Sequence, residues 1–383
     1  MPFQSQLITQ NFDLVEIPSW LLLLLVPALI VSQFILLKRK WIPHFISSLS
    51  PVLTLLLIPL VFTCESPIVF VTVTMQVFVV SLRLLDIAMV PRDVVLKWKI
   101  VDYAEYAFTF ETKNSRMAHQ DALKKKTSKS TAEPQFDNSV PFEKRDADYY
   151  GYLAVRIMAL ALSYNMSMKY IELLVDPASV ATLSFTPLNA KAFMDQICIG
   201  VAIYSSYNIA YTIVYHLIAE VFQIAYQPCM NNPFISLGLQ EFWSNRWNYP
   251  VKTSLKNAAF IPTMKFLKNS TGKPPSWHMV AASFSSFLLS AVIHEWLILA
   301  LCNTPTYFEH LAFFLLHGLL TVLEVMMRKA TRNIFGVDPY KCIPSHVIQI
   351  GTWFVMIWTA NLFTAPLIRD GALVGSKFPI MFI

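Results

Sequence analysis

Charged residues are scarce in this 383-residue sequence: they make up 14% of the chain, whereas hydrophobic residues make up 55%. Water-soluble domains carry about 25% charged residues, so the composition excludes an ordinary soluble protein. Long apolar runs account for the shortage, and the clearest is IPSWLLLLLVPALIVSQFILL at 17–37. A helix needs about 20 apolar residues to cross the hydrocarbon core, and only helices suit such runs in a bilayer. The sequence therefore predicts an all-α, polytopic integral membrane protein.

Glycine is also scarce, with nine residues, and the chain lacks a glycine-rich phosphate loop and a GxSxG nucleophile elbow. A His-Glu-x-x-His zinc motif is absent because position 298 is Ile. No histidine is followed four or five places on by an aspartate, which excludes the motif of soluble-type acyltransferases. The five cysteines are scattered without a CxxC pair, so we expect neither a disulfide framework nor a metal site.

The apolar segments predict about eight transmembrane helices, at 17–37, 44–62, 67–87, 151–174, 195–226, 278–302, 308–327 and 346–365. Lysine and arginine residues follow the first, third, fifth and seventh segments, which the positive-inside rule places on the cytosolic side. We attribute the net charge of +6 to the basic loops that set the membrane orientation, and not to nucleic-acid binding. Asp13 and Glu16 precede the first segment without any basic residue, which argues against a signal peptide.

Three regions are expected from this pattern. Residues 1–90 form the N-terminal transmembrane helices, and 91–150 form a polar, partly disordered cytosolic loop. Residues 151–383 form the core that carries the motifs described next.

Ionisable residues inside the predicted spans indicate a lined cavity. A charge in the bilayer costs about 3 kcal/mol or more, so each such residue requires a partner or a function. His294 and Glu295 are adjacent in SFLLSAVIHEWLILALC and point about 100° apart on a helix. In FFLLHGLLTVLE, His317 and Glu324 are seven apart and share a face, and Gly318 allows close helix approach beside them. A single membrane histidine is equally compatible with a hydrogen-bonded core residue, but two consecutive helices with a His and a Glu each favour a cavity.

The stretch QEFWSNRWN contains a second group of candidates. Trp243 and Trp247 are four apart, so they would share a face of a helix and could anchor it at the membrane interface. Arg246 could then contact a lipid phosphate. Such an aromatic belt does not require an amide at Asn248.

Taken together, SLGLQEFWSNRWN, SAVIHEW and FFLLHGLLTVLE resemble motifs of the membrane-bound O-acyltransferase superfamily, and within it the wax synthase-like branch of plants and fungi. The first is similar to that branch's Phe-Trp-Gly-Arg-Arg-Trp-Asn/His signature, the second to its histidine-bearing helix, and the third to the next helix. The resemblance covers residues 231–324. Ser244 and Asn245 replace the usual Gly and Arg, which removes a cation, and Ile293 stands before His294 in place of a smaller or sulfur-containing residue.

The resemblance implies esterification of an apolar alcohol from the bilayer by an acyl-CoA from the cytosol, in a tunnel between them. It assigns His294 as the catalytic base and Asn248 as the second catalytic residue. Asn248 could donate to the thioester carbonyl, orient the acyl chain or orient the imidazole. We expect substrate contacts from Trp243, Arg246, Trp247, Glu295, His317 and Glu324. Arg246 and the lysines from Lys252 to Lys273 would supply positive charge for the phosphates of CoA. Acyl-CoA is a co-substrate, and we expect no metal or other cofactor. The expected location is the endoplasmic reticulum membrane, with membrane lipid and no nucleic acid as partners.

A long-chain alcohol, giving a wax ester, is the first hypothesis for the acceptor. Sterols, diacylglycerol and terpenoid or polyketide hydroxyls, some of them acetylated, are alternatives within the superfamily. A proton-coupled lipid transporter is an alternative of another class, in which Arg83 and Asp86 would join the four ionisable residues of the predicted cavity. Against it, the chain shows no internal repeat, and Arg83 and Asp86 are three apart and so suited to a structural ion pair. A catalytically inactive lipid-binding scaffold is a third possibility, which the joint presence of His294 and Asn248 disfavours.

Overall fold

The computed structural model of the chain describes residues 14–64, 67–88, 90–100, 102–103, 140–141, 144–176, 183–221, 223, 226–271, 276–302 and 307–369. Most of the predicted cytosolic loop at 91–150 therefore lies outside the described residues.

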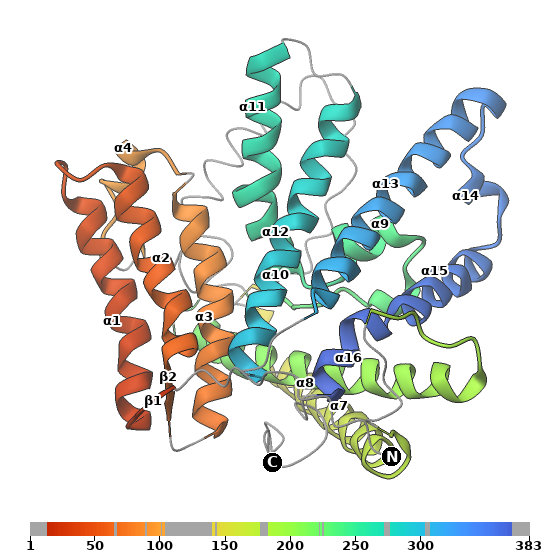
Figure 1. The fold of residues 1–383 in the computed structure, drawn as a ribbon, viewed down its shortest axis with the longest axis horizontal. Coiled ribbons are helices and arrows are strands. Elements are labelled where there is room, and N and C mark those ends of the chain that lie inside the picture. Colours follow the sequence, from red (N-terminus) through yellow and green to blue (C-terminus); the bar gives the residue numbers. More distant parts are fainter. Residues whose placement is uncertain are drawn as a thin grey trace, which may run out of the picture.

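Three long helices form a bundle at the N-terminal end of the described chain (Figure 1): α1 (Ser19–Lys38), α2 (His44–Val61) and α3 (Pro67–Ile87). Pro18 and Pro43 precede the first two helices, where a missing N–H costs no hydrogen bond. The short strands β1 (Val15–Ile17) and β2 (Phe62–Cys64) pair in parallel at one end of the bundle, and α4 (Arg92–Val95) lies at the other. Lys38 closes this second end by donating to the carbonyls of Leu96 and Trp98 at 2.7 and 2.5 Å.

The next pair of helices, α7 (Ala147–Leu174) and α8 (Ala190–Val221), pack against each other and lie in the lower part of Figure 1. Asp146 caps α7 by accepting a hydrogen bond from the Tyr149 amide at 2.9 Å. One face of α7 exposes large apolar side chains at helical spacing, as expected of a surface that faces lipid. They are Val155, Met158, Leu162 and Met166.

The segment between α8 and the next long helix consists of short elements that carry the QEFWSNRWN stretch. They are η3 (Pro233–Ile235), α9 (Leu239–Glu241), η4 (Phe242–Arg246), α10 (Tyr249–Leu255), η5 (Lys256–Phe260) and α11 (Ile261–Thr271). Two of these elements, η4 and η5, are single-turn π-helices, a rare geometry that is frequent at functional sites. Neither π-helix was predicted from the sequence.

The core is completed by α12 (Ser276–Cys302), α13 (Glu309–Phe335), α14 (Pro339–Cys342), α15 (Ser345–Thr359) and α16 (Asn361–Arg369). Helices α12 and α13 pack extensively on each other, and α12 also contacts α3 of the bundle. A Cβ at Gly318 would lie 3.0 Å from the Phe287 side chain, so this glycine allows the close approach expected of it.

The prediction of a helical, polytopic membrane protein is confirmed. Six helical segments of the described chain are long and apolar enough to span a membrane: Ser19–Lys38, His44–Val61, Ala190–Val221, Trp277–Leu301, Glu309–Phe335 and Ser345–Arg369. The other two predicted spans form helices α3 and α7 but are not among these six, so the count of eight is not confirmed.

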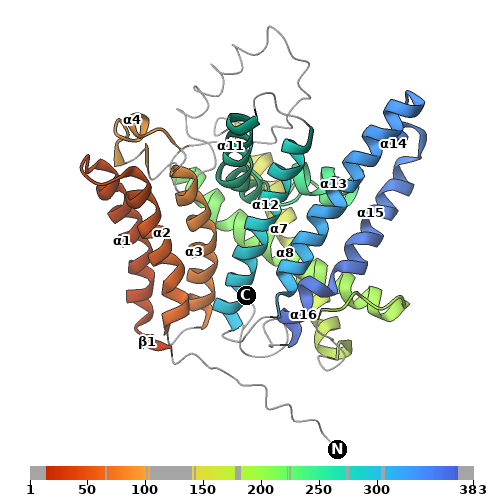
Figure 2. The same ribbon diagram turned by 45° about the horizontal axis from the view of Figure 1, so that its top comes forward.

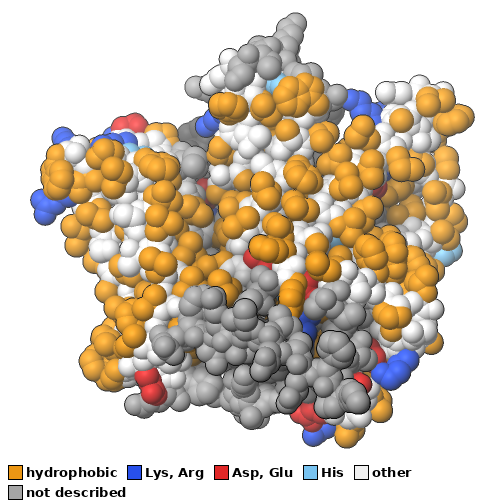
Figure 3. Space-filling view, in the orientation of Figure 1, with side chains coloured by type: hydrophobic (Ala, Val, Ile, Leu, Met, Phe, Trp, Pro, Cys, Tyr) orange, Lys and Arg blue, Asp and Glu red, His pale blue; other side chains and the backbone are white. Residues whose placement is uncertain are grey.

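The basic ends of the helices gather at one end of the molecule, at the top of Figure 1 and Figure 2, where α4, α11 and the C-terminal end of α13 lie. Lys38, Arg92, Lys265 and Arg328 belong to this end, which agrees with the side that the four basic groups are expected to share. Hydrophobic side chains cover the middle of the face shown in Figure 3, and most charged side chains lie toward its upper and lower edges.

Candidate active site

His294 is half-buried in the middle of α12, and its hydrogen bond fixes the state of the ring. Nδ1 lies 2.7 Å from the Ser290 backbone carbonyl, one turn earlier in the helix. A carbonyl can only accept, so Nδ1 carries the proton of the neutral imidazole and Nε2 keeps its lone pair. The local helix geometry therefore presents Nε2 as a base.

Aromatic side chains from three helices surround this imidazole. Phe314 of α13 is 4.3 Å from it between ring centroids, Phe78 of α3 is 5.3 Å away, and Phe363 of α16 is 6.0 Å away. His310 of α13 provides a second imidazole at 6.2 Å. It hydrogen-bonds to the Phe363 backbone carbonyl, and its buried Nδ1 has no hydrogen-bond partner within the described part of the chain.

Glu295, the neighbour of His294, points to a different place and holds the start of α13. Its Oε1 accepts a hydrogen bond from the Leu311 backbone amide at 2.8 Å, in the first turn of that helix. A carboxylate here accepts a hydrogen bond from an otherwise unpaired N–H, and its negative charge interacts favourably with the positive end of the helix dipole. The substrate contact expected of Glu295 stays a prediction, and the geometry gives this residue a capping role.

Asn248 is the N-cap of α10 and adopts the left-handed conformation, with φ of 44°. Its Oδ1 accepts from the Val251 backbone amide at 3.5 Å and from the Tyr207 hydroxyl of α8 at 3.1 Å. These bonds are a structural reason for an amide at this position, which the sequence analysis did not anticipate. They occupy the oxygen and leave the Nδ2 amide protons as the donor group of the side chain.

Apolar packing connects Asn248 to His294. Val251, three residues after Asn248, packs in one cluster with Phe78 and with Ile293, the residue before His294. Phe78 also contacts the His294 ring. The segments that carry the two residues assigned as catalytic by resemblance therefore contact each other through one apolar cluster of α3, α10 and α12.

Trp243 and His317 form a buried hydrogen-bonded chain. The indole Nε1 of Trp243 donates to Nδ1 of His317 at 3.2 Å, and Nε2 of His317 bonds to the Thr359 hydroxyl at 2.8 Å. An indole N–H can only donate, so the proton of the neutral His317 ring lies on Nε2. Both nitrogens of this fully buried ring are bonded, as in a core histidine.

Trp247 does not share a helix face with Trp243, because η4 ends at Arg246 and Trp247 is extended, with φ of −91° and ψ of 130°. Its ring stacks on Phe242 at 5.3 Å and packs in the cluster around Tyr211 and Cys229. The two tryptophans therefore join different parts of the core, and the expected interface anchor is not formed by a shared face.

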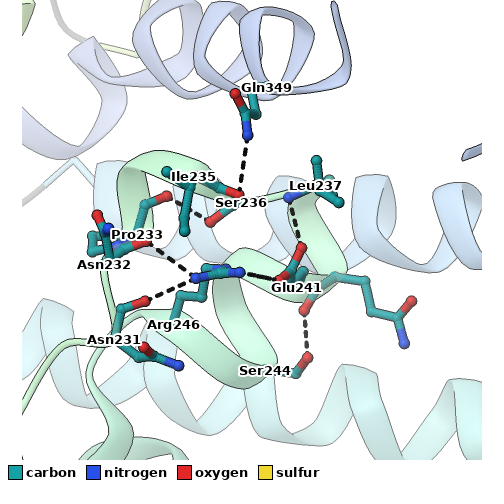
Figure 4. A network of polar contacts seen from close by, with 12 residues as sticks. Asn231, Asn232, Pro233, Ile235, Ser236, Leu237, Glu241, Ser244, Arg246 and Gln349 are labelled. Carbon is teal, nitrogen blue, oxygen red and sulfur yellow. Dashed lines mark hydrogen bonds and ion pairs between the residues drawn. The ribbon is translucent and has the colours of Figure 1, made fainter. Parts of the chain in front are cut away.

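Arg246 holds the loop that carries the motif, as Figure 4 shows. Its guanidinium pairs with Glu241 at 2.6 Å and donates to the carbonyls of Asn231 and Asn232 at 3.2 and 3.4 Å. Glu241 in turn accepts from the Leu237 amide at 2.7 Å. The phosphate contact expected of Arg246 stays a prediction, and its donors are already used inside the protein.

Glu324 fixes the other end of the same loop. Its Oε2 accepts from the Leu239 and Gln240 amides at 2.7 and 3.2 Å, at the start of α9. Gly238, with φ of 104°, allows this approach, because a Cβ there would overlap the Glu324 carboxylate. Burial and the negative charge of Glu324 raise the pKa of Tyr340, which lies beside it.

Most of the predicted site residues thus build a frame around the motif. His294 keeps a basic nitrogen at Nε2, and Asn248 keeps its donors at Nδ2. Three residues near the site were not predicted from the sequence: Ser290, His310 and Tyr207. Ser290 could have been found from its spacing of four before His294, whereas Tyr207 lies on another helix and gave no local signal.

Comparisons with known proteins show which proteins this part of the chain is similar to. Residues 226–316 match the model of the membrane bound O-acyl transferase family. The chain is 34% identical over 149 residues to "Probable long-chain-alcohol O-fatty-acyltransferase 3" of Arabidopsis thaliana, which is 38% of this chain and 41% of the relative. It is 29% identical over 157 residues to the long-chain-alcohol O-fatty-acyltransferase of Simmondsia chinensis, which is 40% of this chain and 43% of the relative.

A relative with another acceptor also matches, the acyl-CoA–sterol O-acyltransferase 1 of Arabidopsis thaliana, at 27% identity over 138 residues, 36% of this chain and 37% of the relative. The matched part spans about two fifths of the length of the first three curated relatives. The family match and these relatives confirm the resemblance of this chain to the membrane-bound O-acyltransferase superfamily and its wax synthase-like branch.

Proposed function

We propose that this protein is an acyl-CoA-dependent O-acyltransferase that esterifies a long-chain alcohol and so forms a wax ester. The names of several relatives support the reaction and the acceptor: one is named a long-chain-alcohol O-fatty-acyltransferase, and two are named probable enzymes of this kind. The observation that carries the proposal is the hydrogen bond from Nδ1 of His294 to the Ser290 carbonyl at 2.7 Å. It leaves a basic nitrogen on a half-buried ring between aromatic walls.

In the proposed reaction, the alcohol oxygen attacks the thioester carbonyl carbon while its proton passes to Nε2 of His294. The carbon–sulfur bond then breaks, and the proton passes from the imidazole to the departing CoA sulfur, which leaves as a thiol. The products are one ester and one free CoA. General base catalysis of this kind contributes about 10²- to 10⁴-fold to the rate.

Asn248 has a complementary role in this proposal, as a hydrogen-bond donor. Negative charge develops on the thioester oxygen during attack, and Nδ2 can donate to it because Oδ1 is held by Tyr207 and Val251. A donor of this kind is worth about 3 kcal/mol in the transition state. The geometry favours this role over orienting the imidazole, since the ring of His294 already bonds to Ser290.

Lysines of α10 to α11 supply a positive surface for the phosphates of CoA. Burial lowers the pKa of Lys252, and so does the positive charge of Lys256, because the two cations repel each other. An anion between them would relieve that repulsion. Lys265 and Lys268 are exposed on α11, at the end of the molecule that the basic residues share, and Lys273 lies outside the described residues.

A sterol is the second candidate for the acceptor, because one relative is named as a sterol O-acyltransferase. The transporter alternative has less support, because several of its relay residues are bonded within the protein. Arg83 pairs with Asp86 at 3.2 Å, and Asp86 also accepts from Asn257 at 3.0 Å. Both nitrogens of His317 are bonded as well.

The proposal includes a location in the endoplasmic reticulum membrane, with the basic end of the molecule toward the cytosol, where acyl-CoA is dissolved. Six candidate spans support a multi-pass protein. Co-localisation of a fluorescent fusion with a marker of this membrane tests the location.

Mass spectrometry of neutral lipids tests the function directly. The protein is expressed in a host that lacks its own ester-forming enzymes, and the cells receive a long-chain alcohol and a sterol together. We expect wax esters, and none in cells with an equal amount of His294→Ala protein. Sterol esters in place of wax esters would change the acceptor, and no ester from correctly inserted wild-type protein would overturn the proposal.

A further inference from the structure

The Asn248 amide is held in one orientation by neighbours that donate to its oxygen. The Val251 backbone amide can only donate, and it faces Oδ1 at 3.5 Å. The Tyr207 hydroxyl donates to the same oxygen at 3.1 Å. Turning the amide over would place its NH2 group against the Val251 N–H, so the observed orientation is the favourable one.

Tyr207 makes the shorter of these two bonds and comes from outside the motif. It lies on α8, 41 residues before Asn248, and packs in the cluster formed by Tyr211, Cys229 and Met230. A 3.5 Å bond is at the long limit for an N–H donor, so Val251 alone restrains the amide weakly. The phenol of Tyr207 is therefore the main restraint on the rotation of the Asn248 side chain.

The Cys229 thiol stands next to this pair and reinforces it. Its sulfur is 4.0 Å from Oδ1 of Asn248 and also contacts the Tyr207 hydroxyl. Burial raises the pKa of the Cys229 thiol, which keeps it protonated and able to donate. Such a thiol is a poor nucleophile, so its place beside Asn248 suits positioning of the amide and not an acyl-enzyme intermediate.

We propose that Tyr207 is a positioning residue, which directs the Nδ2 donors of Asn248 toward the thioester carbonyl by holding Oδ1. This inference rests on the proposed function. It predicts that the benefit of the Tyr207 hydroxyl is expressed through Asn248 alone. A role in packing would instead depend on the ring, which Phe retains.

Turnover of Tyr207→Phe tests the inference, with Tyr204→Phe as the matched control. Tyr204 is one turn earlier on α8, and its ring packs edge-on against Phe234, 4.9 Å away. We expect kcat to fall about tenfold in Tyr207→Phe, the loss expected for one neutral hydrogen bond, with an unchanged KM for acyl-CoA. Tyr204→Phe should keep the wild-type kcat.

A double-mutant cycle separates positioning from an independent effect. In the Asn248→Asp background there is no N–H left to direct, so adding Tyr207→Phe should lower kcat no further. Multiplying effects, or a Tyr207→Phe enzyme with the turnover of Tyr204→Phe, would overturn the positioning role.

A spectroscopic measurement detects the hydrogen bond from Asn248 to the thioester carbonyl without turnover. In infrared difference spectra of bound acyl-CoA with a ¹³C thioester carbonyl, hydrogen bonding from Asn248 should shift the carbonyl stretch below its value in solution. Tyr207→Phe should return the stretch toward that value, and Tyr204→Phe should not. A stretch unaffected by Tyr207→Phe contradicts the inference, whereas a wild-type protein that forms no ester contradicts the proposed function itself.

Discussion

Replacement of Asn248 by Asp separates the capping role of this residue from its proposed role as a hydrogen-bond donor in the reaction. Asp keeps an oxygen that can accept from Val251 and Tyr207, and it is as good an N-cap as Asn. It also tolerates the left-handed conformation found here, at φ of 44°. The change therefore removes the Nδ2 donors and leaves the local fold in place. Ala would in addition lose the cap, at about 1 kcal/mol, and would confuse the two effects.

The expected loss follows from the chemistry of the donor. Removal of one hydrogen-bond donor to a developing oxyanion costs about 2.7–4 kcal/mol, or 10²- to 10³-fold in kcat, and the negative charge of Asp adds repulsion. Microsomes with the variant should esterify a labelled long-chain alcohol with palmitoyl-CoA at least about 100-fold more slowly. Asn245→Asp, the same change at an exposed position of the same motif, is the control and should keep wild-type turnover.

The thermal unfolding midpoint in detergent must be measured on the same samples. We expect Asn248→Asp to unfold within a few degrees of the wild type. Wild-type turnover in a correctly folded Asn248→Asp protein would refute the donor role. A pure rise in the KM for acyl-CoA would assign Asn248 to donor binding instead.

Three further changes test the frame around the motif. Gly238→Ala should lower the unfolding midpoint, because φ of 104° costs a non-glycine residue about 1–3 kcal/mol and the new Cβ meets Glu324, whereas Gly351→Ala, with open space around it, should not. Glu295→Gln should keep most of the turnover and stability, since it keeps the capping oxygen, and a large change in KM would show a substrate contact instead. Arg246→Lys should lower the unfolding midpoint with an unchanged KM for acyl-CoA, and a raised KM at unchanged stability would favour the predicted phosphate contact.

The sequence predicted the helical class and the helix segments because burial in lipid leaves long apolar runs. It was less informative where a helix is short or its surroundings decide. The helix expected through Trp243 and Trp247 ends at Arg246, because the loop bonds of that arginine and the cap at Asn248 turn the chain. Periodicity cannot register a single-turn π-helix or such a turn.

The sequence identified the polar residues of the site, but it did not show which of them bond within the protein and which keep a free donor or acceptor. His317 and Glu324 do share a face of α13, yet Trp243 and the loop amides at Leu239 consume their hydrogen bonds. Those partners lie 74 and 85 residues away along the chain. Spacing within one helix identifies a shared face, and only the tertiary structure tells which atoms remain available.

The most direct test of the central claim measures ester formation at saturating acyl-CoA and alcohol by wild-type and His294→Ala protein at equal membrane levels. If Nε2 of His294 is the base, as we propose, the variant should lose at least about 100-fold in kcat while acyl-CoA still binds. Turnover equal to the wild type would contradict the account.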